Sequence, residues 1–351
     1  MGKKDVKQSD FISTGKKSIF QQVSAWIRGN FFIPDARIFW VKPAVAFLEG
    51  FLKAHTIETI ITTGPPHSIH LIGLRLKKKN PALKWIADLR DPWSEWDLLD
   101  TLALTGMARR RHAMLERSVL NSANGVITIA PYHVRRLEAL GGRKVDLITN
   151  GFDQDDFKGI KKTKTARFTL AHVGMVDELR DPRPVIEVLR DLCREDLDFS
   201  THLSIKFIGQ VNSTFKEYVK SMDELSAAIA FTDYLPHRQL LKLYEETDVQ
   251  LLILAHTVIA PGNLPGKFFE YLASGNAILA LGPVQGDAAE ILRQTKAGEI
   301  FERADKAGLK ASLLRSYGRW KKGETNDLGN IANFTRKNLT AQLVKVLESP
   351  G

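Results

Sequence analysis

From Thr56 onward, short runs of β-branched and apolar residues alternate with longer segments that have the period of an amphipathic helix. This alternation predicts a parallel sheet covered by helices and joined by right-handed crossovers. The predicted fold class is therefore α/β. In the first half of the chain, the predicted strands are 57–62, 84–88, 125–130 and 145–149, and the predicted helices are 67–79, 106–122 and 131–140.

A second series of the same kind begins at Arg167. Before it, residues 158–165 are polar and basic and show no apolar periodicity, which is typical of a linker between domains. We therefore expect one domain over residues 1–160 and another over 165–325, followed by a C-terminal segment, 326–351. The strands predicted in the second series are 167–173, 203–208, 229–232, 249–255 and 277–281.

Upstream of the first predicted strand, residues 26–52 mix aromatic side chains such as Trp26 with basic ones such as Arg28. Such a segment could lie at a membrane interface. The alternative, which we adopt as the prediction, is a pair of helices packed on the sheet and separated at Pro34 and Pro43. No recognised nucleic-acid motif accompanies these residues, so nucleic acid is not an expected partner.

The composition, with 44% apolar and 26% charged residues among 351, indicates a folded chain with two hydrophobic cores. The longest apolar runs fall far short of the roughly 20 residues that a membrane-spanning helix needs. No signal-peptide pattern begins the chain, so we expect a cytoplasmic protein. Cys193 is the single cysteine, which excludes intrachain disulfides and cysteine-rich metal sites and suggests that it fills the core.

The charge is strongly basic, with 50 Lys and Arg against 40 Asp and Glu and a net charge of +10. Such a balance favours an anionic partner: nucleic acid, an acidic membrane surface or a phosphorylated ligand. About half of the excess lies in residues 1–55, which contain nine basic and four acidic side chains.

The most informative stretch, Leu264 to Ala280, has the pattern of a loop, a short helix, a tight turn and a strand. Gly266 begins the helix, so unpaired N–H groups and the positive end of the dipole form an anion site. Lys267 adds a formal charge there, and Glu270 follows on the same helix face. The alternative is an exposed Lys–Glu pair on a surface helix.

A second loop follows the predicted strand 167–173. Gly174 would allow the chain to turn closely over a ligand, and Arg180 could bind phosphates. Asp181 and Pro182 suit the start of the next helix, so the alternative is a well-capped helix with exposed arginines.

Four segments together resemble the bacterial family 4 glycosyltransferases of the GT-B fold. They are 62–68, 88–93, 149–153 and the stretch that contains Lys267 and Glu270. The resemblance implies two Rossmann-like domains facing a cleft and a last helix, near 334–347, that crosses back to the first domain. It also implies a retaining transfer from a nucleotide-diphosphate sugar to a cell-surface polysaccharide or glycolipid precursor.

Within this resemblance, Glu270 corresponds to the glutamate that binds the donor ribose. Lys267 and Arg180 correspond to basic residues near the diphosphate, and His237 lies in the loop beside the base. Asn263 is adjacent to Gly262, which occupies the position of an acidic residue that contacts the donor sugar.

On the acceptor side, His67 and Asp91 follow strands at their carboxyl ends, where open α/β sheets bind ligands. Either side chain could orient the acceptor hydroxyl or accept its proton. The alternatives are an Asp-Pro helix cap for Asp91 and a loop hydrogen bond for His67.

No metal or cofactor is expected. Asp153-Gln154-Asp155 is similar to a metal motif of the other glycosyltransferase fold. It follows Asn150-Gly151, where family 4 has an interdomain loop, and that family stabilises the leaving diphosphate with a helix dipole and basic side chains.

Family members also begin with a strand, a Gly-rich loop and a helix, and no such unit precedes Trp26. The resemblance therefore implies a truncated N-terminal domain and impaired activity. Three alternative functions remain: a sugar-nucleotide-binding protein without transfer, an epimerase of the same fold, and a basic protein that binds nucleic acid or membranes.

Overall fold

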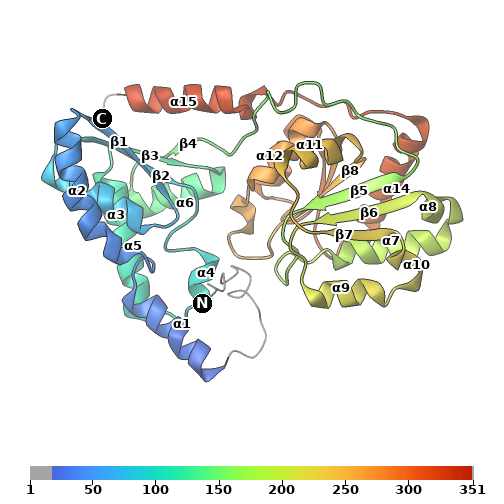
Figure 1. Cartoon of the computed structure of the whole chain (residues 1–351), viewed down its shortest axis with the longest axis horizontal. Coiled ribbons are helices and arrows are strands. Elements are labelled where there is room, and N and C mark those ends of the chain that lie inside the picture. Colours follow the sequence, from blue (N-terminus) through green and yellow to red (C-terminus); the bar gives the residue numbers. More distant parts are fainter. Residues whose placement is uncertain (1–17, 350–351) are drawn as a thin grey trace. The chain divides into compact units, whose positions relative to one another are not determined.

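The computed structural model describes residues 18–349, which divide into two compact units (Figure 1). Unit 1 comprises the chain up to Thr149 together with the residues from Gln342 onward, and unit 2 runs from Asn150 to Ala341. Residues 150–160, expected at the end of the first domain, thus belong to unit 2. Among residues 18–349, no helix is long and apolar enough to span a bilayer.

Unit 1 contains a parallel four-stranded sheet in the order β1-β2-β3-β4. Its strands are β1 (Thr59–Gly64), β2 (Lys84–Leu89), β3 (Gly125–Thr128) and β4 (Asp146–Leu147). Its helices are α1 (Ile19–Phe31), η2 (Ile38–Trp40), α2 (Val41–Ala54), α3 (Ser68–Lys79), α4 (Asp97–Asp100), α5 (Gly106–Ser122) and α6 (Pro131–Gly141). The four predicted strands are confirmed, with β3 and β4 shorter than expected.

Helix α3 packs closely on strand β2, and this contact positions the helix relative to the sheet. A Cβ atom added to Gly73 of α3 would lie only 2.4 Å from the ring of Trp85 on β2, so the two elements meet where a side chain is absent. The Trp85 Nε1 atom also donates to Thr62 Oγ1 on β1 at 2.9 Å. These contacts hold the start of α3, and with it His67, at the carboxyl end of β1.

Both helices of the pair predicted in residues 26–52 are present, as α1 and α2, but their expected packing on the sheet is confirmed only for α2, which reaches the core beside α3. Val41 and Val45 of α2 are buried in the core of unit 1. In α1 the only buried residue is Gly29, and the helix contacts α5 instead of the sheet. An amphipathic pattern predicts a helix, but it does not reveal whether the apolar face has a partner within the chain.

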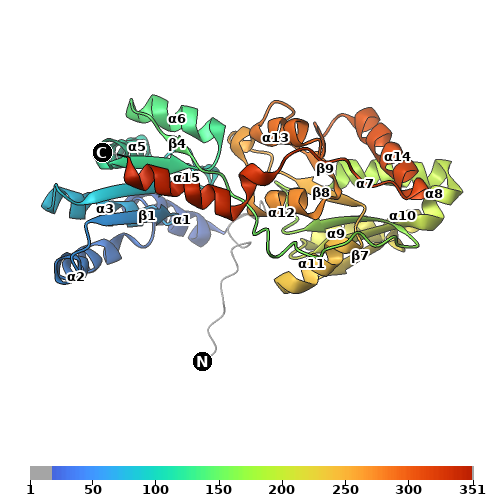
Figure 2. The ribbon, with the colours of Figure 1, turned by 90° about the horizontal axis from the view of Figure 1, so that it is seen from above.

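Unit 2 contains a parallel six-stranded sheet in the order β10-β9-β8-β5-β6-β7, with helices on both faces (Figure 2). The strands are β5 (Phe168–Val173), β6 (Leu203–Ile208), β7 (Ile229–Thr232), β8 (Val249–Ile253), β9 (Ala277–Leu281) and β10 (Gly298–Phe301). The helices are α7 (Arg183–Glu195), α8 (Leu197–His202), α9 (Ser213–Lys220), α10 (Asp223–Ser226), α11 (His237–Glu245), η3 (Ala260–Gly262), α12 (Gly266–Ser274), α13 (Asp287–Thr295), α14 (Lys306–Lys322) and η4 (Ala332–Phe334). The edge strand β10 was not predicted, because its four residues begin with glycine and include an exposed glutamate.

The strand order of unit 2 reverses at β5. From β5 the chain proceeds through β6 and β7 on one side and then returns to add β8, β9 and β10 on the other. Ligands of open α/β sheets bind at the carboxyl ends of the strands at such a switch point. Cys193 is buried in the core of this unit, as expected.

Helix α15 (Arg336–Glu348) belongs to both units. Its Leu339 is buried in unit 2. Towards the end of the helix, Lys84 Nζ of β2 donates to the carbonyl oxygens of Leu347 and Ser349 at 2.5 and 2.6 Å.

A cluster of buried histidines completes the core of unit 1. His67 stacks on Trp93, with ring centroids 5.3 Å apart and planes at 6°. His70 shares a hydrogen bond of 2.9 Å with Thr62 Oγ1, and the Trp93 Nε1 atom donates to His112 Nδ1 at 3.1 Å. Burial lowers the pKa of His67 and His112 to about 4 and that of His70 to about 3.

We predict that unit 1 loses stability as the pH falls from about 6.5 towards 4. The folded pKa values lie below the unfolded value, so the unfolded chain takes up protons that the folded unit cannot bind. Each histidine should contribute a loss on the order of 1–2 kcal/mol by about pH 5. Urea unfolding at several pH values measures it.

His67→Phe keeps the stack on Trp93 and removes one titrating group, so its stability should depend less on pH than that of the wild type. An unchanged pH dependence would show that His67 is not held neutral by the fold.

Candidate functional site

The switch point of unit 2 begins at Gly174, directly after β5. Gly174 has a φ of +131°, and its N–H donates to the carbonyl oxygen of Ile208 at 2.7 Å. A Cβ atom at this position would lie 2.8 Å from Lys267 Nζ. The backbone conformation therefore requires glycine, and the missing side chain leaves room for the end of the Lys267 side chain.

Lys267 lies in the first turn of α12, after the extended residue Pro265. Its Nζ atom donates to the carbonyl oxygen of Val173 at 2.8 Å. The N–H of the same residue, Val173, donates to Tyr271 Oη at 2.8 Å. Two side chains of α12 thus attach the helix to the end of β5, and the positive end of its dipole lies beside Gly174.

The surroundings of Lys267 favour an anionic ligand. Burial lowers the pKa of Lys267 to about 7, and the positive charge of Arg180 acts in the same direction. Among the described residues, the Lys267 ammonium contacts the carbonyl oxygen of Val173, and the nearby charge that acts on it is the positive charge of Arg180. A bound anion would stabilise the charged form of this lysine.

Arg180 is near this site but already has a partner. Its Nη1 atom lies 2.7 Å from Asp177 Oδ2, and its backbone N–H donates to Asp177 Oδ1 at 2.8 Å. The carboxylate fixes the loop after β5 and offsets part of the arginine charge. Arg183 is similarly paired with Asp181 at 2.7 Å. The expected cap is wrong, because Pro182 and not Asp181 is the N-cap residue of α7 and provides no side-chain cap.

Glu270 follows Lys267 on α12 and contacts α11. Its Oε2 atom accepts from the Tyr244 hydroxyl at 3.1 Å, and its Oε1 atom lies 3.6 Å from His237 Nε2. Burial raises the pKa of Tyr244, which keeps its hydroxyl a donor. The structure thus brings His237 and Glu270 together, and the half-buried carboxylate keeps lone pairs for ligand hydroxyls.

Gly262 and Asn263 lie in the segment that leads from β8 to α12. Gly262 is buried at the end of η3, and the Asn263 N–H donates to the carbonyl oxygen of Ala260 at 3.0 Å. Nearby, Asn150 Nδ2 donates to the carbonyl oxygen of Leu264 at 3.0 Å. This bond attaches the Asn150-Gly151 segment to the loop before Lys267.

In unit 1, His67 is buried and none of the described residues hydrogen-bonds to either ring nitrogen. The expected alternative of a loop hydrogen bond is therefore wrong. Trp93, on which His67 stacks, is itself held by Glu116, which accepts from the N–H groups of Trp93 and Ser94 at 3.2 and 2.9 Å.

Asp91 follows β2 at the same sheet edge, since Gly64 and Leu89 are paired in the parallel sheet. It does not cap a helix, because α4 begins only at Asp97, so that alternative is also wrong. Burial raises the pKa of the Asp91 carboxyl, while the charge of Arg90 opposes the rise. No hydrogen bond between Asp91 and His67 is found among the described residues.

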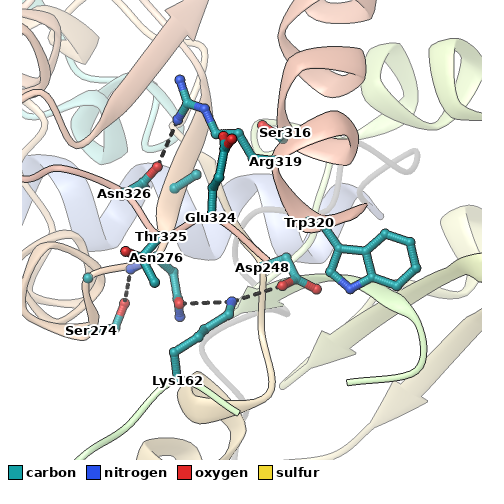
Figure 3. A pocket seen from close by; sticks show the side chains of 12 residues that line it. Lys162, Asp248, Ser274, Asn276, Ser316, Arg319, Trp320, Glu324, Thr325 and Asn326 are labelled. Atoms are coloured by element: carbon teal, nitrogen blue, oxygen red, sulfur yellow. Dashed lines mark hydrogen bonds and ion pairs between the residues drawn. The ribbon is translucent and has the colours of Figure 1, made fainter. Parts of the chain in front are cut away.

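A pocket of about 230 Å³ lies at the opposite end of the unit 2 sheet, where β8 and β9 begin (Figure 3). Its charged groups bind each other: Lys162 Nζ lies 2.9 Å from Asp248 Oδ1 and 3.2 Å from Asn276 Oδ1. Arg319 similarly donates to Asn326 at 2.9 Å. Because ligands bind at the carboxyl ends of parallel strands, we do not assign the donor site to this pocket.

The candidate site contains no recognisable metal centre. Between residues 18 and 349, no group of three or more His, Cys, Asp or Glu side chains is arranged to hold an ion. In the Asp153-Gln154-Asp155 segment, Asp153 Oδ1 accepts from the Asp155 N–H at 3.0 Å, and Asp155 pairs with Lys158 at 2.5 Å.

Several residues of these sites escaped the sequence analysis. Tyr244 donates to Glu270, Tyr271 attaches α12 to β5, and His112 and Glu116 hold Trp93. Each acts across a large sequence separation, so no periodic or motif signal identifies it.

The fold is similar to that of known glycosyltransferases. Sucrose-phosphate synthase from Thermosynechococcus elongatus has a TM-score of 0.59 at 13% identity, over 89% of this chain and 78% of that one. Anabaena HepE, solved with UDP and glucose, has a TM-score of 0.60 at 14% identity, over 88% and 82% of the two chains. WaaG, a glycosyltransferase involved in lipopolysaccharide biosynthesis, has a TM-score of 0.54 at 14% identity, over 79% and 82%.

No protein-family model and no curated protein matches the sequence. At these identities the structural similarity shows the fold alone. The chain therefore has the α/β architecture of the GT-B glycosyltransferases, with two Rossmann-like domains.

Proposed function

We propose that this protein is a retaining glycosyltransferase of the family 4 type. It moves a sugar from a nucleotide-diphosphate donor to a cell-surface polysaccharide or glycolipid precursor. The observation that carries the proposal is the position of Lys267: a cation at a helix N-terminus, beside Gly174, at the switch point of a parallel sheet. Such an arrangement suits a diphosphate.

In this proposal unit 2 binds the donor. Lys267, Arg180 and the first N–H groups of α12 stabilise the negative charge that grows on the leaving diphosphate. Glu270, oriented by Tyr244, accepts hydrogen bonds from the ribose hydroxyls. His237 lies beside the base, and Asn263 contacts the donor sugar.

Unit 1 binds the acceptor. Asp91 has a carboxyl whose pKa is raised by burial, which makes it a better proton acceptor for an attacking hydroxyl. The buried, uncharged ring of His67 is suited to orient that hydroxyl, provided that the acceptor displaces the packing around it.

A second candidate is a sugar-nucleotide-binding protein that does not transfer the sugar. Two observations favour it. Gly262 stands where the family has an acidic residue, and Arg180 already forms an ion pair with Asp177 at 2.7 Å. Donor hydrolysis and transfer assays distinguish the two candidates. Impaired activity stays a prediction that the same assays test.

We also propose that the protein acts in the cytoplasm, in peripheral contact with an anionic membrane. The expected partners are a nucleotide sugar and a glycan or lipid-linked acceptor, and not nucleic acid.

Glu270→Ala should weaken nucleotide-diphosphate binding roughly ten- to hundredfold, because charge-assisted hydrogen bonds to two hydroxyls are lost. Calorimetry with UDP, GDP and ADP measures the effect on whichever nucleotide binds. Glu290→Ala is the matched control, since Glu290 is an exposed helix carboxylate paired with Arg293. Equal affinities of wild type and Glu270→Ala would refute the ribose assignment.

Nucleotide-diphosphate affinity should fall as the pH rises above about 7, by up to roughly tenfold per pH unit. Lys267 binds the anion in its protonated form, and its pKa of about 7 in the unliganded protein means that the proton is lost above neutrality. Lys267→Met should bind weakly at every pH and lose this dependence. If the variant keeps the pH profile of the wild type, another group is responsible.

Binding and transfer should not require a metal. Treatment with EDTA is expected to leave the calorimetric affinity unchanged, since the charge of the diphosphate is met by the helix N-terminus and basic side chains. Loss of binding with EDTA and recovery with Mn²⁺ or Mg²⁺ would contradict this account.

A further inference from the structure

Helix α1 presents a row of large apolar side chains to solvent. Phe20 is 83% exposed, Ile19 80% and Phe31 69%. Val23, Trp26 and Ile27 are between 42% and 50% exposed. A single exposed apolar residue is ordinary on a protein surface, but six on one helix indicate an interaction surface.

The six side chains lie on one face of α1. At 100° per residue they occupy an arc of about 140°, and polar residues such as Gln21 and Arg28 lie outside it. α1 is thus an amphipathic helix whose apolar face is largely exposed among residues 18–349 and is covered in part only near Asn30, where the helix meets the loop before α5.

The attachment of α1 to unit 1 is specific. Asn30 Oδ1 accepts from the Thr105 N–H at 2.8 Å, and its Nδ2 donates to the carbonyl oxygen of Ala103 at 3.3 Å. A Cβ atom on Gly29 would lie 2.6 Å from Leu104, so the helix end packs tightly on the loop before α5. At the other end, Ser18 and Gln21 form a capping box.

Positive charge lies on the helix that α1 contacts, although Arg109 there pairs with Asp100 at 2.8 Å. The first turns of α5, the helix that α1 contacts, contain the exposed Arg109, Arg110 and Arg111, with the 82% exposed Met107 beside them. In the sequence before α1, residues 1–17 contain five lysines and two aspartates. This charge complements an anionic lipid surface rather than a neutral one.

We propose that α1 lies in the headgroup region of an anionic bilayer, with its apolar face towards the acyl chains and the arginines of α5 near the lipid phosphates. A Trp- and Phe-rich apolar face flanked by basic residues is characteristic of interfacial helices. The proposal identifies the element that makes the membrane contact of the proposed function. It does not depend on the donor site, and it would bring unit 1 close to lipid-linked molecules.

The test uses the full chain and vesicle sedimentation. Binding is expected to vesicles of phosphatidylcholine with phosphatidylglycerol, and weak binding or none to phosphatidylcholine alone. The double variant Phe20→Glu, Ile27→Glu should reduce the partition coefficient at least roughly tenfold. Leu197→Glu is the matched control, because Leu197 is 81% exposed in unit 2, and it should bind like the wild type.

Three outcomes would overturn the proposal. First, the wild type could fail to bind anionic vesicles. Second, the double variant could bind as well as the wild type, and this result would mean that the protein binds polyanions in general. Third, the wild type could fail to bind vesicles and, in sedimentation velocity without lipid, self-associate while the double variant is monomeric. A second copy of the chain would then cover the apolar face. Circular dichroism confirms that the variant is folded, and its unchanged nucleotide affinity separates this test from that of the proposed function.

Discussion

The contact between the Lys267 ammonium and the carbonyl oxygen of Val173 determines the geometry of the candidate donor site. Beside it, Gly174 has a φ of +131°, which favours glycine, and the absence of a side chain leaves room for the Lys267 ammonium. Through the Lys267 contact, and through Tyr271, the N-terminus of α12 is held against the end of β5. Glu270, one turn further along, is then oriented by Tyr244 of α11. The positions of the candidate donor residues Lys267 and Glu270 therefore both depend on the position of helix α12.

The proposed acceptor side of unit 1 is built on a different principle. Its histidine lies among aromatic rings and uncharged imidazoles, and its charged groups, such as Asp91 beside Arg90, lie at the end of β2. Trp93 connects His67, His112 and Glu116 by stacking and hydrogen bonding. Because burial keeps the imidazoles neutral, His67 itself adds no fixed charge to this region.

The alternation of apolar runs and helical segments was sufficient to predict the α/β class and nine of the ten strands in residues 18–349, because central strands such as β5 and β8 are short, buried and apolar. The motif around Lys267 and Glu270 similarly placed the donor residues on one helix. The sequence could not show that Tyr244 orients Glu270 or that Asp177 forms an ion pair with Arg180, because these contacts depend on packing. For α1, the pattern predicted the helix but not that its apolar face lies exposed.

The division of helix α15 between the two units has a consequence for biosynthesis. Unit 2 is continuous in sequence from Asn150 to Ala341, whereas unit 1 includes the residues from Gln342 onward. Lys84 on β2 can bind its two carbonyl partners, Leu347 and Ser349, only after residues 150–341 have been synthesised. During translation, unit 1 therefore gains these contacts only after the whole of unit 2 has been made.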